Sequence, residues 1–95
     1  MADIHVRATD ETEQELQFEV EVAEAGSRTR HVVTVQRADV DALGDRYSDP
    51  GQLVRSSFEF LLDRESKESI LARFDLRDIS RYFPEFDRDL LHPGS

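Results

Sequence analysis

The chain has 95 residues, of which 21 are acidic and 12 basic, giving a net charge of −9, and it has no cysteine. This length predicts one domain over residues 1–95, the missing thiols exclude disulfides and thiolate metal sites, and the acidic excess argues against direct binding to nucleic acid or anionic lipid. No apolar run approaches the roughly 20 residues of a membrane span, and the N-terminus lacks signal-peptide features, so we expect a cytoplasmic protein without membrane contact.

Residues 3–36 are predicted to form a sheet, because apolar and polar side chains alternate there. Such alternation is present in 4–8, 16–22 and 30–36. In the second segment the apolar residues are Leu16, Phe18, Val20 and Val22. Alternation with a period of two is typical of a strand that is buried on one face only.

A tight turn is predicted between the second and third strands, with Gly26 and Ser27 as its central residues. Glycine at the first central position suits a type II′ turn, because it adopts positive φ at little cost. The expected register pairs Val22 with His31, Val20 with Val33, and Phe18 with Val35. Glu21 would then lie diagonal to Arg30 on the exposed face, and such pairs contribute about 0.2–1 kcal/mol.

The helical part is predicted over residues 39–86. A short helix over 39–43 would end at Gly44, and a long helix would begin with Asp49 as N-cap and Pro50 as its first residue. The long helix is expected to run to Glu65. Its apolar residues fill an arc of roughly 200° at 100° per residue, so we expect one flank to pack on the sheet and the other on later helices.

Two short helices are predicted after the long one. Ser66 would cap the first, with Ile70, Leu71 and Phe74 buried, and Asp75 with Asp78 would form a capping box for the second. Pro84 would end that helix, Phe86 can fold back on the core, and the tail 92–95 should fray. The predicted fold class is therefore α+β: a two- or three-stranded antiparallel sheet followed by one long and two or three short helices on one face.

The C-terminal half carries the string FEFLL, followed by RESKESIL, FDL, an isoleucine and YFPE, over residues 58–85. In this it resembles a family of small uncharacterised prokaryotic proteins of similar length, in which a similar strand pair precedes these residues. The similarity covers the chain from about Val32 onward. It implies the same order of elements, and it implies no activity, cofactor or functional residue.

The candidate interaction face is a stripe of glutamates on odd positions of the second strand. Glu15, Glu19 and Glu21 would share one face, with Arg30 beside them. Side chains two apart on a strand lie about 6.5–7 Å apart, a spacing that a hard cation bridges. The ordinary alternative is a solvated face, and no calcium-loop pattern lies nearby, so we predict no metal site and no cofactor.

Other candidates have equally ordinary explanations. His5, His31 and His92 lie on three segments without metal-ligand spacing, and His31 is expected to be a half-buried packing residue. The serines lack a nucleophile elbow, so no catalytic residue is predicted. The turn 64–68 is either a recognition spot or helix-end electrostatics. The aromatic segment 82–86 either closes the core or, where exposed, forms an interface.

These observations favour a non-enzymatic interaction or regulatory module whose acidic face meets a basic protein partner. One alternative is an antitoxin-like or nucleic-acid-associated regulator that acts through a basic partner, and another is a small enzyme of unrecognised type. We expect no direct nucleic-acid contact. A sheet this small has exposed edges, so the predicted state is a monomer or a weak homodimer.

Overall fold

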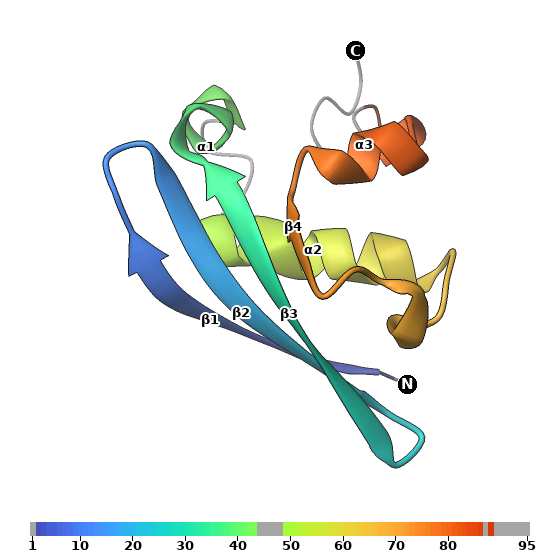
Figure 1. The fold of residues 1–95 in the computed structure, drawn as a ribbon. Coiled ribbons are helices and arrows are strands. Elements are labelled where there is room, and N and C mark those ends of the chain that lie inside the picture. Colours follow the sequence, from blue (N-terminus) through green and yellow to red (C-terminus); the bar gives the residue numbers. More distant parts are fainter. Residues whose placement is uncertain (1, 44–48, 87, 89–95) are drawn as a thin grey trace.

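The computed structural model describes residues 2–43, 49–86 and 88 (Figure 1). Its elements are β1 (Asp3–Glu11), β2 (Glu15–Glu24), β3 (Ser27–Gln36), α1 (Arg37–Leu43), α2 (Pro50–Leu62), η1 (Lys67–Ser69), β4 (Arg73–Asp75) and α3 (Asp78–Tyr82). The predicted helix end at Gly44, the position of His92 and the frayed tail 92–95 lie outside the described residues.

The predicted fold class is wrong, because the sheet has four strands and is mixed. Strands β1, β2 and β3 form an antiparallel meander, and β4 pairs parallel to β3, with Phe74 opposite Val33. A parallel pair needs a long crossover connection, which α1 and α2 supply here (Figure 1). We predicted a helix through Phe74 because a three-residue strand with one apolar residue is too short to show alternation.

The hairpin between β2 and β3 turns one residue earlier than predicted. Its central residues are Ala25 and Gly26, with φ of 54° and 80°, as in a type I′ turn. Moving the turn by one residue changes each pairing by two positions, so the predicted register was wrong although the buried face was right. The observed partners are Phe18 with Val33, Val20 with His31, and Val22 with Thr29.

We expect Ala25→Asn to raise the free energy of unfolding by about 1 kcal/mol, because the left-handed conformation costs an alanine about 1–2 kcal/mol and suits asparagine. Urea denaturation of the two proteins measures the change. The control is Ala23→Asn in the adjoining strand, where asparagine has no such advantage. A midpoint that falls on Ala25→Asn would contradict the turn geometry.

Helix α2 begins as predicted and ends earlier. Asp49 is its N-cap and accepts a hydrogen bond from the backbone N–H of Gln52 at 3.0 Å, and Pro50 is its first residue. The helix is 13 residues long and ends at Leu62, so the extension to Glu65 was wrong. Just beyond this end, the N–H groups of Arg64 and Glu65 share the carbonyl of Leu61.

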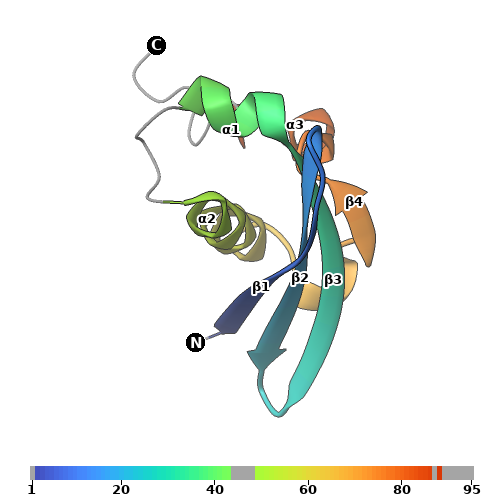
Figure 2. The same cartoon turned by 90° about the vertical axis from the view of Figure 1, so that its left-hand side faces the viewer.

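The two flanks of α2 pack on different partners, as the wide apolar arc predicted. The Phe58 ring lies 5.3 Å from the His31 ring on β3 and 6.0 Å from Phe74 on β4. The Phe60 ring lies 5.2 Å from Phe86, and both of these side chains are buried. Figure 2 shows α2 against one side of the twisted sheet. The core therefore joins the sheet, α2 and the C-terminal segment.

The segment after α2 differs from the two predicted short helices. Residues 67–69 form a single 3-10 turn, and the Ser66 side chain accepts no capping hydrogen bond from it. Helix α3 begins at Asp78 with Arg77 as its N-cap, so the prediction that Asp75 caps it was wrong. One bond of the predicted capping box is present, because the Asp78 carboxylate accepts from the N–H of Asp75 at 3.2 Å, whereas the Asp75 carboxylate accepts from the N–H of Arg77 at 2.9 Å. These bonds join the end of β4 to α3.

Two arginines tie the helices to the rest of the fold. Arg77 forms a two-pronged hydrogen bond with Asp39 of α1, at 2.8 and 3.0 Å, and this hydrogen bond raises the pKa of the Arg77 guanidinium. Arg55 of α2 donates to the carbonyl of Ile4 at 2.8 Å. Since β1 is an edge strand of the sheet, this contact covers part of an edge that is otherwise available to a second chain.

Candidate functional site

The predicted interaction residues lie on or beside the outer face of the sheet. Glu19 forms an ion pair with Arg7 of β1 at 3.1 Å. Glu21 lies directly opposite Arg30, not diagonal to it, and meets Arg30 at 3.5 Å and Arg28 at 3.4 Å. The structure therefore brings Glu21 and Arg30 together.

Glu15 lies apart from this group, at the start of β2 opposite Gln36, and is exposed. The two glutamates in the middle of the stripe already have arginine partners, in exposed pairs of the kind that contribute about 0–1 kcal/mol. The outer face thus alternates in charge. The sequence did not reveal Arg7 as a partner, because the pairing depends on the β1–β2 register.

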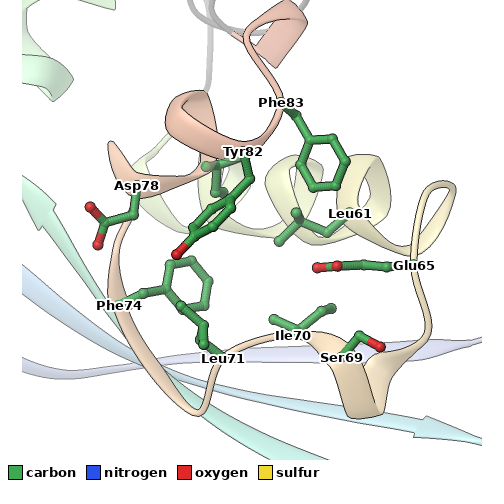
Figure 3. Close-up of a pocket in the computed structure, with 10 residues that line it drawn as sticks. Leu61, Glu65, Ser69, Ile70, Leu71, Phe74, Asp78, Tyr82 and Phe83 are labelled. Atoms are coloured by element: carbon green, nitrogen blue, oxygen red, sulfur yellow. The ribbon is translucent and has the colours of Figure 1, made fainter.

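A pocket with a volume of about 340 Å³ lies where the end of α2, η1, β4 and α3 meet, and we call it the C-terminal pocket (Figure 3). Its apolar wall consists of Leu61, Ile70, Leu71, Phe74, Ile79 and Phe83. The other lining residues are Glu65, Ser69 and Asp78, which are polar, and Tyr82, an aromatic ring that carries a hydroxyl. Mostly apolar walls with a few polar groups are typical of binding sites.

The C-terminal pocket is lined by residues of two segments that were separate candidates in the sequence analysis. Glu65 comes from the turn 64–68, and Tyr82 and Phe83 come from the aromatic segment 82–86. Within that segment Phe86 is buried and closes the core, whereas Tyr82 is 68% exposed. Phe86 therefore follows the core-closure alternative, whereas Tyr82 has the exposure that the interface alternative requires.

Leu71 departs from its predicted position. We expected it to be buried beside Ile70, and it is 50% exposed. Leu71 and Tyr82 are the two large apolar side chains that are exposed among the described residues, and both line the C-terminal pocket. An amphipathic helix over 66–74 would have buried Leu71, and the extended chain leading into β4 turns it outward.

His31 holds this extended segment to the sheet. It is 2% exposed, so the prediction of a half-buried residue was wrong. Its Nδ1 lies 2.8 Å from the carbonyl oxygen of Leu71, and its Nε2 lies 2.8 Å from the hydroxyl of Thr29. A carbonyl only accepts, so Nδ1 carries the proton, and in the neutral ring Nε2 accepts from Thr29. His31 thereby positions the backbone of a pocket wall.

The polar groups of the C-terminal pocket differ in their partners. Asp78 accepts the backbone bond from Asp75 and lies 3.8 Å from the guanidinium of Arg81. Glu65 is half-buried and points into the pocket (Figure 3), and among the described residues its carboxylate has no hydrogen-bond or ion-pair partner. Glu65 is thus the acidic group of the wall that remains available to a ligand.

Next to the pocket, Lys67 is buried in η1 and forms an ion pair with Glu68 at 2.6 Å. The hydrogen bond from Lys67 lowers the pKa of the Glu68 carboxyl, because it stabilises the charged form. A carboxyl whose pKa is lower in the folded state stabilises the fold at pH values above its ordinary pKa of 4.5. This contribution is lost as the pH falls through the lowered pKa.

We therefore expect Glu68→Gln to be less stable than the wild type at neutral pH, with the difference shrinking below pH 4.5. Thermal melts across this pH range measure it. The matched control is Glu59→Gln, which removes an exposed carboxylate from α2. A difference from the wild type that stayed constant down to acid pH would exclude the linkage to this ion pair.

Within residues 2–43, 49–86 and 88, no group of three or more histidine, aspartate or glutamate side chains is arranged to hold a metal ion. Among the same residues, no helix is long and apolar enough to cross a membrane. No protein-family model, curated protein or solved structure matches this chain. The resemblance of the C-terminal half to small prokaryotic proteins therefore stays a prediction.

Proposed function

We propose that the protein is a non-enzymatic interaction module of the cytoplasm that binds a partner protein at the C-terminal pocket. The observation that supports this is the placement of Leu71 and Tyr82: the large apolar side chains that are exposed in the described chain both line one pocket. Exposed apolar residues gathered at one concave place are typical of protein interfaces.

The geometry suits an anchor from the partner. The C-terminal pocket is about 340 Å³ in volume, at the small end of the range for ligand sites. One large side chain of a partner would fill much of it. Binding would cover the exposed parts of Leu71 and Tyr82, and aromatic residues that surround a pocket are frequent hot spots.

A basic partner is favoured by charge. The chain carries −9 overall, which attracts cationic proteins at long range. The glutamates Glu19 and Glu21 of the outer face already pair with arginines, so we place the contact at the C-terminal pocket and not on the glutamate stripe. An antitoxin-like role, in which the module neutralises a basic partner, belongs to the same class and would use the same contact.

Site-specific photocrosslinking tests this function. Tyr82 is replaced by the photoreactive aromatic p-benzoylphenylalanine in the full chain, which is produced and irradiated in the cells of its source. The matched control carries the same group at the exposed Gln52 of α2. A third protein combines the Tyr82 probe with Leu71→Asp, which places a charge on the pocket wall.

We expect an adduct of defined mass from the Tyr82 probe, a strongly reduced yield with Leu71→Asp, and no such adduct from Gln52. Circular dichroism of each variant confirms that it is folded. Equal adducts from both positions, or an adduct that persists with Leu71→Asp, would exclude the C-terminal pocket as the binding site.

A further inference from the structure

Glu65 places a carboxylate inside the C-terminal pocket. Its carboxylate points into a space whose other side is formed by the ring of Tyr82 and by apolar side chains such as Leu61 (Figure 3). The second carboxylate of the wall, Asp78, is already used by the backbone of Asp75 and by Arg81. Among the described residues Glu65 has no such partner.

Because Glu65 is half-buried, its carboxylate remains accessible to water while the pocket is open. An occupant that fills the pocket displaces this water. If the occupant is neutral or anionic, the carboxylate loses its hydration without gaining a cation, which is costly in an apolar environment. If the occupant ends in a cation, the lost hydration is replaced by a charge-assisted hydrogen bond.

The remaining walls suit a side chain with an apolar stem and a charged end. Leu61 and Ile70 offer aliphatic surface beside Glu65, and Tyr82 offers an exposed aromatic ring. Arginine and lysine pack their methylene groups on apolar surface while the charged end remains near polar groups, and their cations are also attracted to aromatic rings. A neighbouring apolar residue of the partner would cover the exposed part of Leu71.

We infer that the C-terminal pocket takes an arginine or lysine side chain of the partner, flanked by apolar residues, and that Glu65 selects for its positive charge. This inference rests on the proposed function, because it requires that the pocket is the binding site. It adds the chemical class of the bound segment, and it adds Glu65 as the residue that recognises the positive charge of that segment.

The test uses three capped peptides that differ in one side chain: acetyl-Leu-Arg-Leu-amide, the same peptide with citrulline, and the same peptide with glutamate. Citrulline has nearly the shape of arginine without the charge. Each is titrated into ¹⁵N-labelled wild type, Glu65→Gln and Glu59→Gln, while the amide signals of Ser69, Leu71 and Tyr82 are followed. Glu59→Gln removes the same charge outside the pocket lining.

We expect the arginine peptide to bind the wild type and Glu59→Gln about tenfold more tightly than the citrulline peptide, the ratio expected of a charge-assisted hydrogen bond. The glutamate peptide should bind most weakly. In Glu65→Gln, arginine and citrulline peptides should bind alike. Unchanged signals outside the pocket show that Glu65→Gln is folded.

Two other outcomes are distinguishable. If arginine and citrulline peptides bind the wild type equally at the pocket signals, the charge selection is overturned and the proposed binding site stands. If no peptide shifts the signals of Ser69, Leu71 and Tyr82, both the selection and the binding of such segments at the pocket are overturned. A preference for arginine that survives in Glu65→Gln assigns the selection to another residue and overturns the role of Glu65.

Discussion

Replacing Phe58 with alanine should lower the free energy of unfolding by about 3–5 kcal/mol, the range for truncating a buried phenylalanine. Phe58 is fully buried, and its ring touches those of His31 and Phe74, which belong to two different strands. The cavity would lie where α2 meets both strands of the parallel pair, so neither strand can close it alone. The free energy of unfolding of a single domain is only about 5–15 kcal/mol, so this substitution should remove a large part of it.

Urea denaturation of wild type and Phe58→Ala measures this loss, with Glu59→Ala as the control. Glu59 is the next residue of the same helix and is exposed, so its truncation tests helix propensity without opening a cavity. Phe58→Leu should retain part of the stability, because it leaves a smaller cavity. A denaturation midpoint for Phe58→Ala equal to that of Glu59→Ala would show that α2 does not pack on the sheet through this ring.

Replacing His31 with phenylalanine should lower the free energy of unfolding by about 1–3 kcal/mol, even though the new ring is similar in size, because it leaves a buried polar group without its partner. The groups concerned are the carbonyl of Leu71 and the hydroxyl of Thr29. The bond to Leu71 spans 40 residues of sequence and holds the chain that enters β4. The loss should therefore also loosen one wall of the C-terminal pocket.

The control for His31→Phe is His5→Phe, at an exposed histidine of the edge strand. A double-mutant cycle with Thr29→Val separates the two hydrogen bonds, since removing both partners of the Thr29–His31 bond costs less than the sum of the single changes. Amide hydrogen exchange near Leu71 should accelerate in His31→Phe and remain unchanged in His5→Phe. Equal stability of the two histidine variants would show that the hydrogen bond from His31 to the carbonyl of Leu71 does not stabilise the fold.

The sequence predicted which side chains of the first three strands point inward, because alternation with a period of two depends only on neighbours along the chain. It could not fix their register. Turns centred on Gly26–Ser27 and on Ala25–Gly26 give pairings that differ by two positions, and both keep Val20 and Val22 on the buried face. The positive φ at Ala25 decides the register, and no pattern of apolar residues reports it.

The candidate site was predictable only in fragments. The turn 64–68 and the segment 82–86 both stood out from their composition, whereas their joint pocket depends on the path of the chain between them. That path follows from β4, and a three-residue strand around Phe74 has too little periodicity to be distinguished from a helix. The exposure of Leu71 follows from the same strand.

By itself, the sequence determined the inward faces of the first three strands, the start of α2 at Asp49 and Pro50, and the two-sided packing of that helix, since local spacing and local capping encode all three. Only the tertiary structure decided the parallel pairing of β4, the arginine partners of Glu19 and Glu21, and the meeting of Glu65 with Tyr82 in one pocket. These contacts join residues that are distant in sequence, and their geometry depends on the whole chain having folded.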